Sequence, residues 1–196
     1  MANKNVYMIG GPNGAGKTSA AMTLLPGFLS INEFVNADNI ASGLSPLNPD
    51  SMAVTAGKLM IKRIDSLIKE GKNFAFETTC AGRNHVNTLI KCKEAGYQTN
   101  LIFLWLPDEE IAVDRVKNRV QQGGHNIPEN IIRRRYKTGL YNLVHLYIPN
   151  CDNVTIYDNA KMPLLSGQRE IVAIKMDNQD IEIRNDQKWQ FIQESL

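Results

Sequence analysis

The chain has 196 residues, of which 43% are hydrophobic and 21% are charged, and its formal net charge is +2 at pH 7. This length and composition are typical of one globular domain, residues 1–196, with a single sizeable core, and they exclude a low-complexity chain. The near-neutral charge argues against a protein that follows a long nucleic-acid track.

The cysteines and the apolar runs indicate the compartment. The cysteines are odd in number and none has C-x-x-C spacing: they are Cys80, Cys92 and Cys151. This argues against a disulfide framework or a zinc site and favours a reducing cytosol, with Cys80 as a packing residue rather than a nucleophile. Glycines cut short the first apolar run, and the run at residues 101–106 is far too short to span a bilayer. We therefore expect a cytoplasmic protein without a membrane partner.

Residues 11–18 read Gly-Pro-Asn-Gly-Ala-Gly-Lys-Thr and match the phosphate-binding pattern G-x-x-x-x-G-K-T. A short apolar run at residues 6–9 predicts a strand before this loop, and residues 19–25 predict a helix after it. Glycines let the loop turn so that its N–H groups and the helix N-terminus form an anion nest. Lys17 adds a positive charge at the β- and γ-phosphates, and the Thr18 hydroxyl is the predicted Mg²⁺ ligand. The predicted nucleotide-binding residues are Gly11, Pro12, Asn13, Gly14, Ala15, Gly16, Lys17, Thr18 and Ser19.

Downstream of the phosphate loop, short apolar strands alternate with helices. Pro26 and Gly27 mark a break after the first helix. We expect further strands at residues 33–36, 73–78, 101–106 and 154–158. We expect helices from residue 39, from 50 or 51 to about 69 with Asp50 or Ser51 as the cap, at 83–95, at 109–121 and from 128 through 147. This alternation predicts an α/β fold with a mostly parallel five-stranded sheet and helices on both faces.

Two further segments complete the predicted domain. The loop Gly-Gly-His-Asn at residues 123–126 joins two basic helices and predicts a small lid at about residues 120–135, with His125 as a polar lid residue rather than a base. Residues 171–176 and 180–184 predict a hairpin, followed by a closing helix, so that a C-terminal hairpin and helix occupy about residues 168–196. The loop at residues 159–163 is the expected contact for the nucleotide base.

Two carboxylates follow predicted strands, and right-handed crossovers bring such strand ends to one edge of the sheet. Asp38 could accept a proton from an attacking hydroxyl; the alternatives are a carboxylate that faces Mg²⁺ and a helix N-cap. Glu77, with Thr78 beside it, could bind substrate hydroxyls or hold Mg²⁺ through water; the alternative is a structural carboxylate that caps the region of Arg83. Arg83 could pair with a phosphate of the acceptor or face water.

Arginines flank the predicted lid loop: Arg115, Arg119, Arg133, Arg134 and Arg135. Phosphoryl transfer spreads negative charge over the transferred group, and arginines delivered by a closing lid can neutralise that charge. A solvated basic face is the alternative for at least two of the five. We select Arg119 and Arg134 as catalytic candidates, beside Lys17 and Asp38.

Taken together, these segments resemble the zeta-toxin family of P-loop kinases. Besides the phosphate loop, the matching blocks are F-V-N-A-D at residues 34–38, F-E-T-T-C-A-G-R at 76–83, G-G-H-N-I-P at 123–128 and R-R-R-Y-K-T-G-L at 133–140. The blocks cover about residues 6–160. The phosphate loop alone is shared by many proteins, and the order and spacing of the other blocks make the match more specific.

The resemblance implies a P-loop NTPase fold of the kinase-like, three-layer type and an ATP- and Mg²⁺-dependent phosphotransferase. In the well-known toxins the acceptor is UDP-N-acetylglucosamine, phosphorylated on a sugar hydroxyl, so a small molecule of this kind is the implied substrate. On this analogy Lys17 binds phosphate, Asp38 is the base, Glu77 and Thr78 face the acceptor, and lid arginines stabilise the transferred charge. One chain leaves open whether an antitoxin protein is a partner.

Two other classes of function stay open. One is a nucleotide-dependent regulatory switch or ATPase that acts on a protein partner. The chain has no N-K-x-D segment, which argues against a GTPase and predicts a preference for ATP, and no aliphatic strand that ends in Asp-Glu, which argues against a motor ATPase. The other class is a nucleoside or RNA-end kinase.

Overall fold

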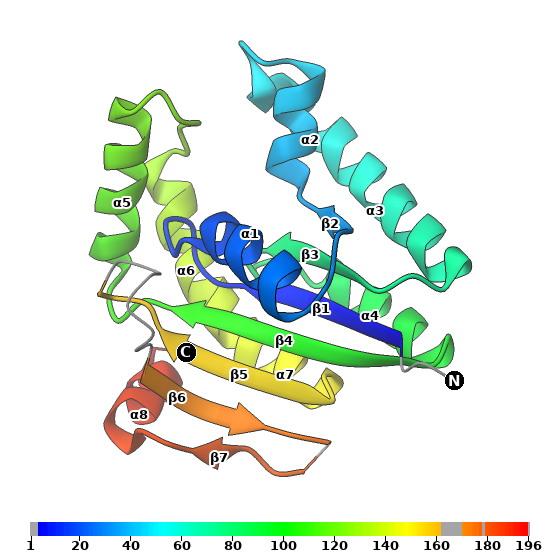
Figure 1. The fold of residues 1–196 in the computed structure, drawn as a ribbon. Helices are drawn as coiled ribbons and strands as arrows, with labels where there is room; N and C mark the ends of the chain where they lie inside the picture. The colour runs from blue at the N-terminus through cyan, green and yellow to red at the C-terminus, as the bar shows by residue number, and fades with distance from the viewer. Residues whose placement is uncertain (1–3, 162–169, 178, 196) are drawn as a thin grey trace.

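The computed structural model describes residues 4–161, 170–177 and 179–195. Within these residues, seven strands form one sheet in the order β2-β3-β1-β4-β5-β6-β7 (Figure 1). The strands are β1 (Lys4–Gly10), β2 (Phe34–Val35), β3 (Phe74–Thr78), β4 (Tyr97–Trp105), β5 (Asn153–Asp158), β6 (Glu170–Lys175) and β7 (Glu182–Ile183). Strands β2, β3, β1, β4 and β5 are parallel, whereas β6 and β7 pair antiparallel to their neighbours.

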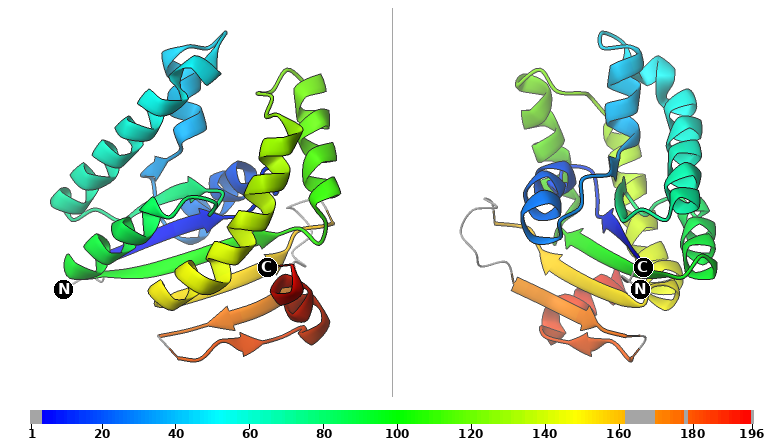
Figure 2. Two further views of the ribbon diagram at one scale, coloured as in Figure 1. Left: turned by 180° about the vertical axis from the view of Figure 1, so that it is seen from behind. Right: turned by 45° about the vertical axis from the view of Figure 1, so that its right-hand side comes forward.

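Helices cover both faces of this sheet (Figures 1 and 2). They are α1 (Lys17–Phe28), α2 (Ala37–Leu44), the 3-10 turn η1 (Pro49–Met52), α3 (Ala53–Glu70), α4 (Asn84–Glu94), α5 (Glu109–Gln121), α6 (Glu129–Asn142), the π-helical turn η2 (Leu143–Tyr147), α7 (Ile148–Asn150) and α8 (Asp186–Glu194). Two arms, α2 with α3 and α5 with α6, rise on either side of α1 and the phosphate loop. The structure is therefore the expected three-layer α/β arrangement, with its loops gathered at one edge.

The alternation of side chains along the central strands decides which helix covers which face. In β1, Met8 joins the larger cluster, which includes Ile64 of α3 and Leu89 of α4. The next residue, Ile9, joins a smaller cluster with Ala21 of α1. Because successive residues of a strand point to opposite faces, both sides of β1 are buried, as a central parallel strand requires.

The prediction of a five-stranded, mostly parallel sheet is wrong. The predicted C-terminal hairpin is confirmed as β6 and β7, but it joins the main sheet instead of standing apart, so that the sheet has seven strands in the described residues and is mixed. The reason is that β5 would otherwise be an edge strand with unpaired N–H and C=O groups, and β6 pairs with them. Residues 168, 169, 178 and 196 of the predicted C-terminal segment, and 162–163 of the predicted base loop, lie outside the described residues.

Several predicted boundaries are also corrected. Helix α1 continues through Pro26 to Phe28, because a proline in the last turn removes a single helix bond. Neither Asp50 nor Ser51 caps α3: these residues form η1, which runs directly into α3. Strand β4 begins four residues earlier than predicted, because polar residues at its start pair with β1. The single helix predicted from 128 through 147 is α6 followed by the π-helical turn η2.

Candidate active site

The phosphate loop connects β1 to α1 with an open helix N-terminus. Gly11 has φ 143°, and a Cβ atom there would lie 2.5 Å from the carbonyl oxygen of Leu104. Gly14 has φ 77°, and a Cβ atom there would lie 2.8 Å from the carbonyl oxygen of Ala112. Glycine is therefore required at both positions. Gly16 precedes α1 without a side-chain cap, which leaves the first N–H groups of the helix free for an anion.

A buried polar network lies directly behind the loop. Lys17 donates from Nζ to the carbonyl oxygen of Pro12 at 2.9 Å, and its Nζ lies 3.7 Å from Oε1 of Glu77. Burial lowers the pKa of Lys17, whereas the charges of Glu77 and Asp38 raise it. Glu77 accepts hydrogen bonds at Oε2 from the Thr18 hydroxyl and from Nδ2 of Asn36, each at 2.7 Å. Glu77 is thus held by Lys17, Thr18 and Asn36, beside the phosphate loop. It does not cap the region of Arg83.

Asp38 lies in the first turn of α2 and is exposed. The N-cap of this helix is Asn36, whose Oδ1 accepts from the backbone N–H groups of Asp38 and Asn39 at 2.8 and 3.2 Å. The alternative of Asp38 as the helix cap is therefore wrong. The Asp38 carboxylate therefore does not cap the helix, and Asp38 lines the cavity described next.

A cavity of about 510 Å³ opens at the phosphate loop. It brings together many of the residues predicted from the sequence: Asn13, Lys17, Asp38, Glu77, Thr78 and Arg134. Arg83 and Arg119 are not among its lining residues, and Arg83 is exposed. The cavity also has polar lining residues that the sequence analysis did not select: Asn36, Thr79, Asn84, His85, Arg135 and Thr138.

The five arginines around the predicted lid loop differ in their contacts. Arg134 and Arg135 line the cavity. Arg115 donates to the carbonyl oxygens of Gly14 at 3.4 Å and Ala160 at 2.7 Å, so that it joins the phosphate loop to the segment after β5. Arg119 donates to the carbonyl oxygen of His125, in the predicted lid loop, at 2.8 Å. The Nε atom of Arg119 is buried and has no hydrogen-bond partner among the described residues.

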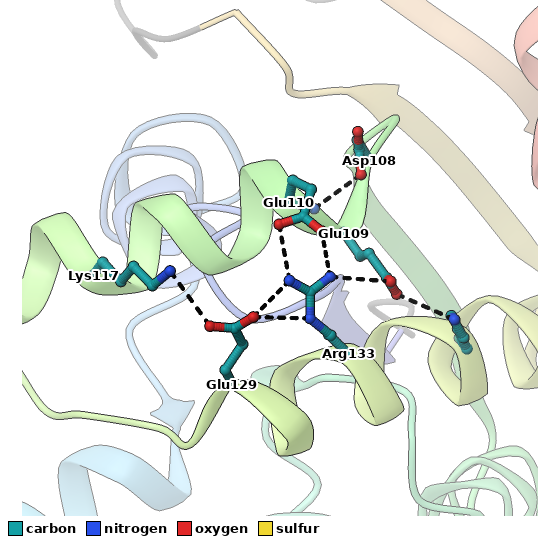
Figure 3. Close-up of polar contacts among 7 residues, drawn as sticks. Asp108, Glu109, Glu110, Lys117, Glu129 and Arg133 are labelled. Carbon is teal, nitrogen blue, oxygen red and sulfur yellow. Dashed lines mark hydrogen bonds and ion pairs between the residues drawn. The ribbon is translucent and has the colours of Figure 1, made fainter.

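Arg133 belongs to an ionic network instead (Figure 3). Its guanidinium contacts Glu110 through its two terminal nitrogens, Glu129 Oε1 at 2.6 Å and Glu109 Oε1 at 3.2 Å. Lys117 pairs with the second oxygen of Glu129 at 3.4 Å. This network joins α5 to α6, and Arg133 is not among the lining residues of the cavity.

The loop after β3 is fixed by the end of α6 and by η2. Nδ2 of Asn142 donates to the carbonyl oxygens of Cys80 and Ala81 at 2.9 and 3.1 Å, and the Tyr147 hydroxyl donates to the carbonyl oxygen of Gly82. Cys80, with φ 60°, is buried, and burial raises the pKa of its thiol. A buried thiol of this kind packs and does not attack, which agrees with the interpretation of Cys80 from the sequence.

The donor set at the loop fits Mg²⁺. The Thr18 hydroxyl and the Glu77 carboxylate are 2.7 Å apart, and both offer the hard oxygen ligands that Mg²⁺ prefers. Among residues 4–161, 170–177 and 179–195, no group of three or more His, Cys, Asp or Glu side chains could hold a metal by itself. No helix in the described part of the chain is long and apolar enough to cross a membrane.

The strand order, the phosphate loop after β1 and the polar cavity at the carboxyl ends of the strands define a P-loop nucleotide-binding domain with a kinase-like fold. The chain belongs to the AAA domain family AAA_33, whose model matches residues 6–139. An uncharacterised protein of Haemophilus influenzae (strain ATCC 51907 / DSM 11121 / KW20 / Rd) is 31% identical over 136 residues, which cover 69% of this chain and 94% of that protein.

Solved structures share the fold at low sequence identity. The AvrRxo1-ORF1:AvrRxo1-ORF2 structure with sulphate ions has a TM-score of 0.76 at 14% identity and covers 97% of this chain, which spans 63% of that longer chain. The PezAT chromosomal toxin-antitoxin system of Streptococcus pneumoniae has a TM-score of 0.67 at 15% identity, with 100% and 85% of the two chains covered. A gluconokinase from Sinorhizobium meliloti 1021 has a TM-score of 0.51 at 14% identity, with 81% and 84% covered.

Proposed function

We propose that this protein is an ATP- and Mg²⁺-dependent phosphotransferase of the zeta-toxin type that phosphorylates a hydroxyl group of a small molecule. The observation that carries the proposal is the convergence of Lys17, Asp38, Glu77 and Arg134 around one cavity at the mouth of the phosphate loop. A second structure of the AvrRxo1-ORF1 complex, named as a complex with ATP, has a TM-score of 0.73 to this chain, which supports ATP as the nucleotide.

Each residue has a role in this proposal. Backbone N–H groups of the phosphate loop bind the phosphates, and Lys17 adds a positive charge beside them. The acceptor hydroxyl approaches from the cavity, and a carboxylate oxygen of Asp38 takes its proton as the new O–P bond forms. Arg134 on α6 and Arg119 on α5 stabilise the charge on the transferred group.

The remaining residues of the network position these groups. Glu77 orients the Thr18 hydroxyl, and Asn36 fixes the Glu77 carboxylate and caps the helix that carries Asp38. Thr18 and Glu77 are the residues that would hold Mg²⁺, which when bound supplies charge neutralisation at the phosphates.

Two experiments test the proposal. The first measures ATP consumption by the full chain with a panel of acceptors: UDP-N-acetylglucosamine, N-acetylglucosamine, gluconate, uridine and RNA with free ends. UDP-N-acetylglucosamine is the first acceptor to test, because the sequence resembles the zeta-toxin family. RNA ends are included because the Pnkp1/Rnl/Hen1 RNA repair complex has a TM-score of 0.57 to this chain at 18% identity, with 74% of this chain and 47% of that chain covered. Stimulation by no member of the panel would contradict a small-molecule kinase.

The second experiment tests Asp38 as the base. Asp38→Asn keeps the size of the side chain but cannot take the proton, so kcat should fall by roughly 10²–10⁴-fold with little change in ATP affinity. Asp65→Asn on α3 is the matched control, because Asp65 pairs with Lys91 and does not line the cavity, and it should keep full activity. A loss of Mg²⁺-ATP affinity together with kcat would assign Asp38 to the metal instead, and an unchanged kcat would remove it from the chemistry.

An antitoxin-type protein is the proposed partner, supported by the two-component names of the AvrRxo1-ORF1:AvrRxo1-ORF2 and PezAT structures. The corresponding test is co-expression with the protein encoded next to this one, followed by co-purification. Recovery of this chain alone would count against such a partner.

A further inference from the structure

A buried side chain from the end of β5 holds the phosphate loop. Asn159 follows β5 directly and is 4% exposed. Its Nδ2 atom donates to the carbonyl oxygen of Ala15 at 2.6 Å, across 144 positions of the sequence. A Cβ atom at Gly16 would lie 3.4 Å from the same Nδ2 atom, so the amide also packs against the last glycine of the loop. The Asn159 side chain therefore contacts the peptide unit that joins Ala15 to Gly16.

This contact sets the direction of that peptide unit. The C=O and N–H groups of a trans peptide point in opposite directions, so an Ala15 carbonyl that points toward Asn159 turns the Gly16 N–H away from it. Asn159 is not among the lining residues of the cavity, whereas Lys17, the residue after Gly16, lines it. Within the described residues the Gly16 N–H has no hydrogen-bond partner. This N–H is therefore free to bind a phosphate oxygen.

The glycines on either side of Ala15 make this orientation easy to lose. Gly14 and Gly16 have φ of 77° and 76°. Glycine adopts positive and negative φ about equally well, so a loop with two such residues has other conformations of similar energy. Selecting one conformation when a ligand binds costs conformational entropy, and a contact that is already present in the free protein reduces this cost. The Asn159 contact is of this kind.

Asn159 is itself held in place by its surroundings. Its backbone N–H donates to the carbonyl oxygen of Trp105, at the end of β4, at 2.9 Å. The next residue, Ala160, donates from its N–H to Oδ1 of Asp158 at 2.8 Å and accepts from Arg115 at 2.7 Å. The amide that contacts Ala15 is therefore anchored to β4, β5 and α5.

We propose that Asn159 is a positioning residue for nucleotide binding, which holds the peptide between Ala15 and Gly16 so that the Gly16 N–H meets a phosphate oxygen of ATP. Asn159 acts through the loop and not by touching the nucleotide phosphates. This inference rests on the ATP-binding part of the proposed function. It assigns a role to a residue that lies far outside the phosphate-loop pattern of residues 11–18.

One substitution removes the contact without changing the loop sequence. Asn159→Ala should raise the Kd for Mg²⁺-ATP roughly 10-fold, the effect of about one hydrogen bond, in isothermal titration calorimetry of the full chain without an acceptor. Asn100→Ala is the matched control. The Asn100 amide is also buried and donates to a backbone carbonyl oxygen, that of Val6, at 3.2 Å. Because Val6 lies toward the start of β1 and the phosphate loop follows its end, the Kd of this control should stay within about twofold.

Steady-state kinetics separate positioning from a general loss of structure. With the acceptor of the panel above that the wild type uses fastest, Asn159→Ala should raise the KM for ATP roughly 10-fold and keep kcat within about threefold. The reason is that the Gly16 N–H binds the phosphates both before and during transfer, so its loss weakens both states alike. A fall in kcat with an unchanged KM for ATP would overturn the inference. If Asn159→Ala shows no cooperative unfolding transition in urea, Asn159→Leu, which fills the same space without a donor, carries the same expectations.

The two proposals fail in different ways. If the wild-type chain does not bind Mg²⁺-ATP, the proposed nucleotide is wrong and the role of Asn159 fails with it. If the wild type binds Mg²⁺-ATP but uses no acceptor of the panel, the small-molecule kinase fails, and the calorimetric Kd still decides the role of Asn159. If Asn159→Ala binds Mg²⁺-ATP as well as the wild type does, or Asn100→Ala loses as much affinity as Asn159→Ala, the inference about Asn159 fails alone.

Discussion

The buried imidazole of His85 predicts a pH dependence of stability that does not depend on any substrate. Burial lowers the pKa of His85 in the folded protein to about 4, whereas the ordinary pKa of histidine is 6.5. Between these two values the unfolded chain binds a proton that the folded chain does not bind. The free energy of unfolding therefore rises with pH in this range, and the contribution of His85 is lost as the pH falls from about 6.5 toward about 4.

The magnitude follows from the size of the pKa difference. Each pKa unit corresponds to about 1.4 kcal/mol, so the full contribution of His85 is about 3 kcal/mol, of which about 2 kcal/mol is lost by a pH of about 5. This is a large share of the stability of a typical domain, which is about 5–15 kcal/mol.

The assay is urea denaturation of the wild type and of His85→Asn at a series of pH values from about 7.5 to about 5, extrapolated to water. Asparagine does not titrate, so the difference in unfolding free energy between the two proteins isolates the proton taken up by His85. Relative to the variant, the wild type should lose about 2 kcal/mol across this range. An unchanged difference in unfolding free energy across this pH range would show that His85 takes up its proton in the folded state, which would refute the reasoning.

Three further predictions concern the loop, the packing of α6 and the lid. Lys17→Ala should lower kcat by roughly 10²–10³-fold in an ATP-consumption assay while the thermal unfolding transition persists; near-normal turnover would contradict the assigned role. Gly139→Ala places a Cβ atom 2.7 Å from the carbonyl oxygen of Thr79 and should destabilise the fold by about 1–2 kcal/mol in urea. Gly57→Ala meets no described atom within 4 Å and should stabilise it by up to about 1 kcal/mol, so equal effects would refute the packing argument. Backbone hydrogen exchange in residues 121–128 should slow when a non-hydrolysable ATP analogue and an acceptor bind together, and slow exchange without ligands would rule out a mobile lid.

The residues that meet at the site differ in how far the sequence could reveal them. The phosphate loop was predictable, because its glycine spacing serves a local backbone conformation. Asp38, Glu77 and Thr78 were predictable as neighbours, since the ends of adjacent parallel strands share one edge of the sheet. Asn36 was missed, although it lies two residues before Asp38, because its role combines a helix cap with a hydrogen bond to a side chain 41 positions away.

The sequence by itself determined the local elements and their class. Periodic apolar residues, helix-ending glycines and the phosphate loop act over a few neighbouring residues, and they were sufficient to predict the α/β alternation and the C-terminal hairpin. The tertiary structure alone decided which groups are free to act. Arg133 and Arg134 are adjacent in the sequence, but they have different surroundings. Arg133 forms ion pairs with three glutamates, Glu109, Glu110 and Glu129, and so joins α5 to α6. Arg134 lines the cavity. The same holds for His85: its burial against Phe76 and its unpaired nitrogen arise from packing between elements, which no local pattern encodes.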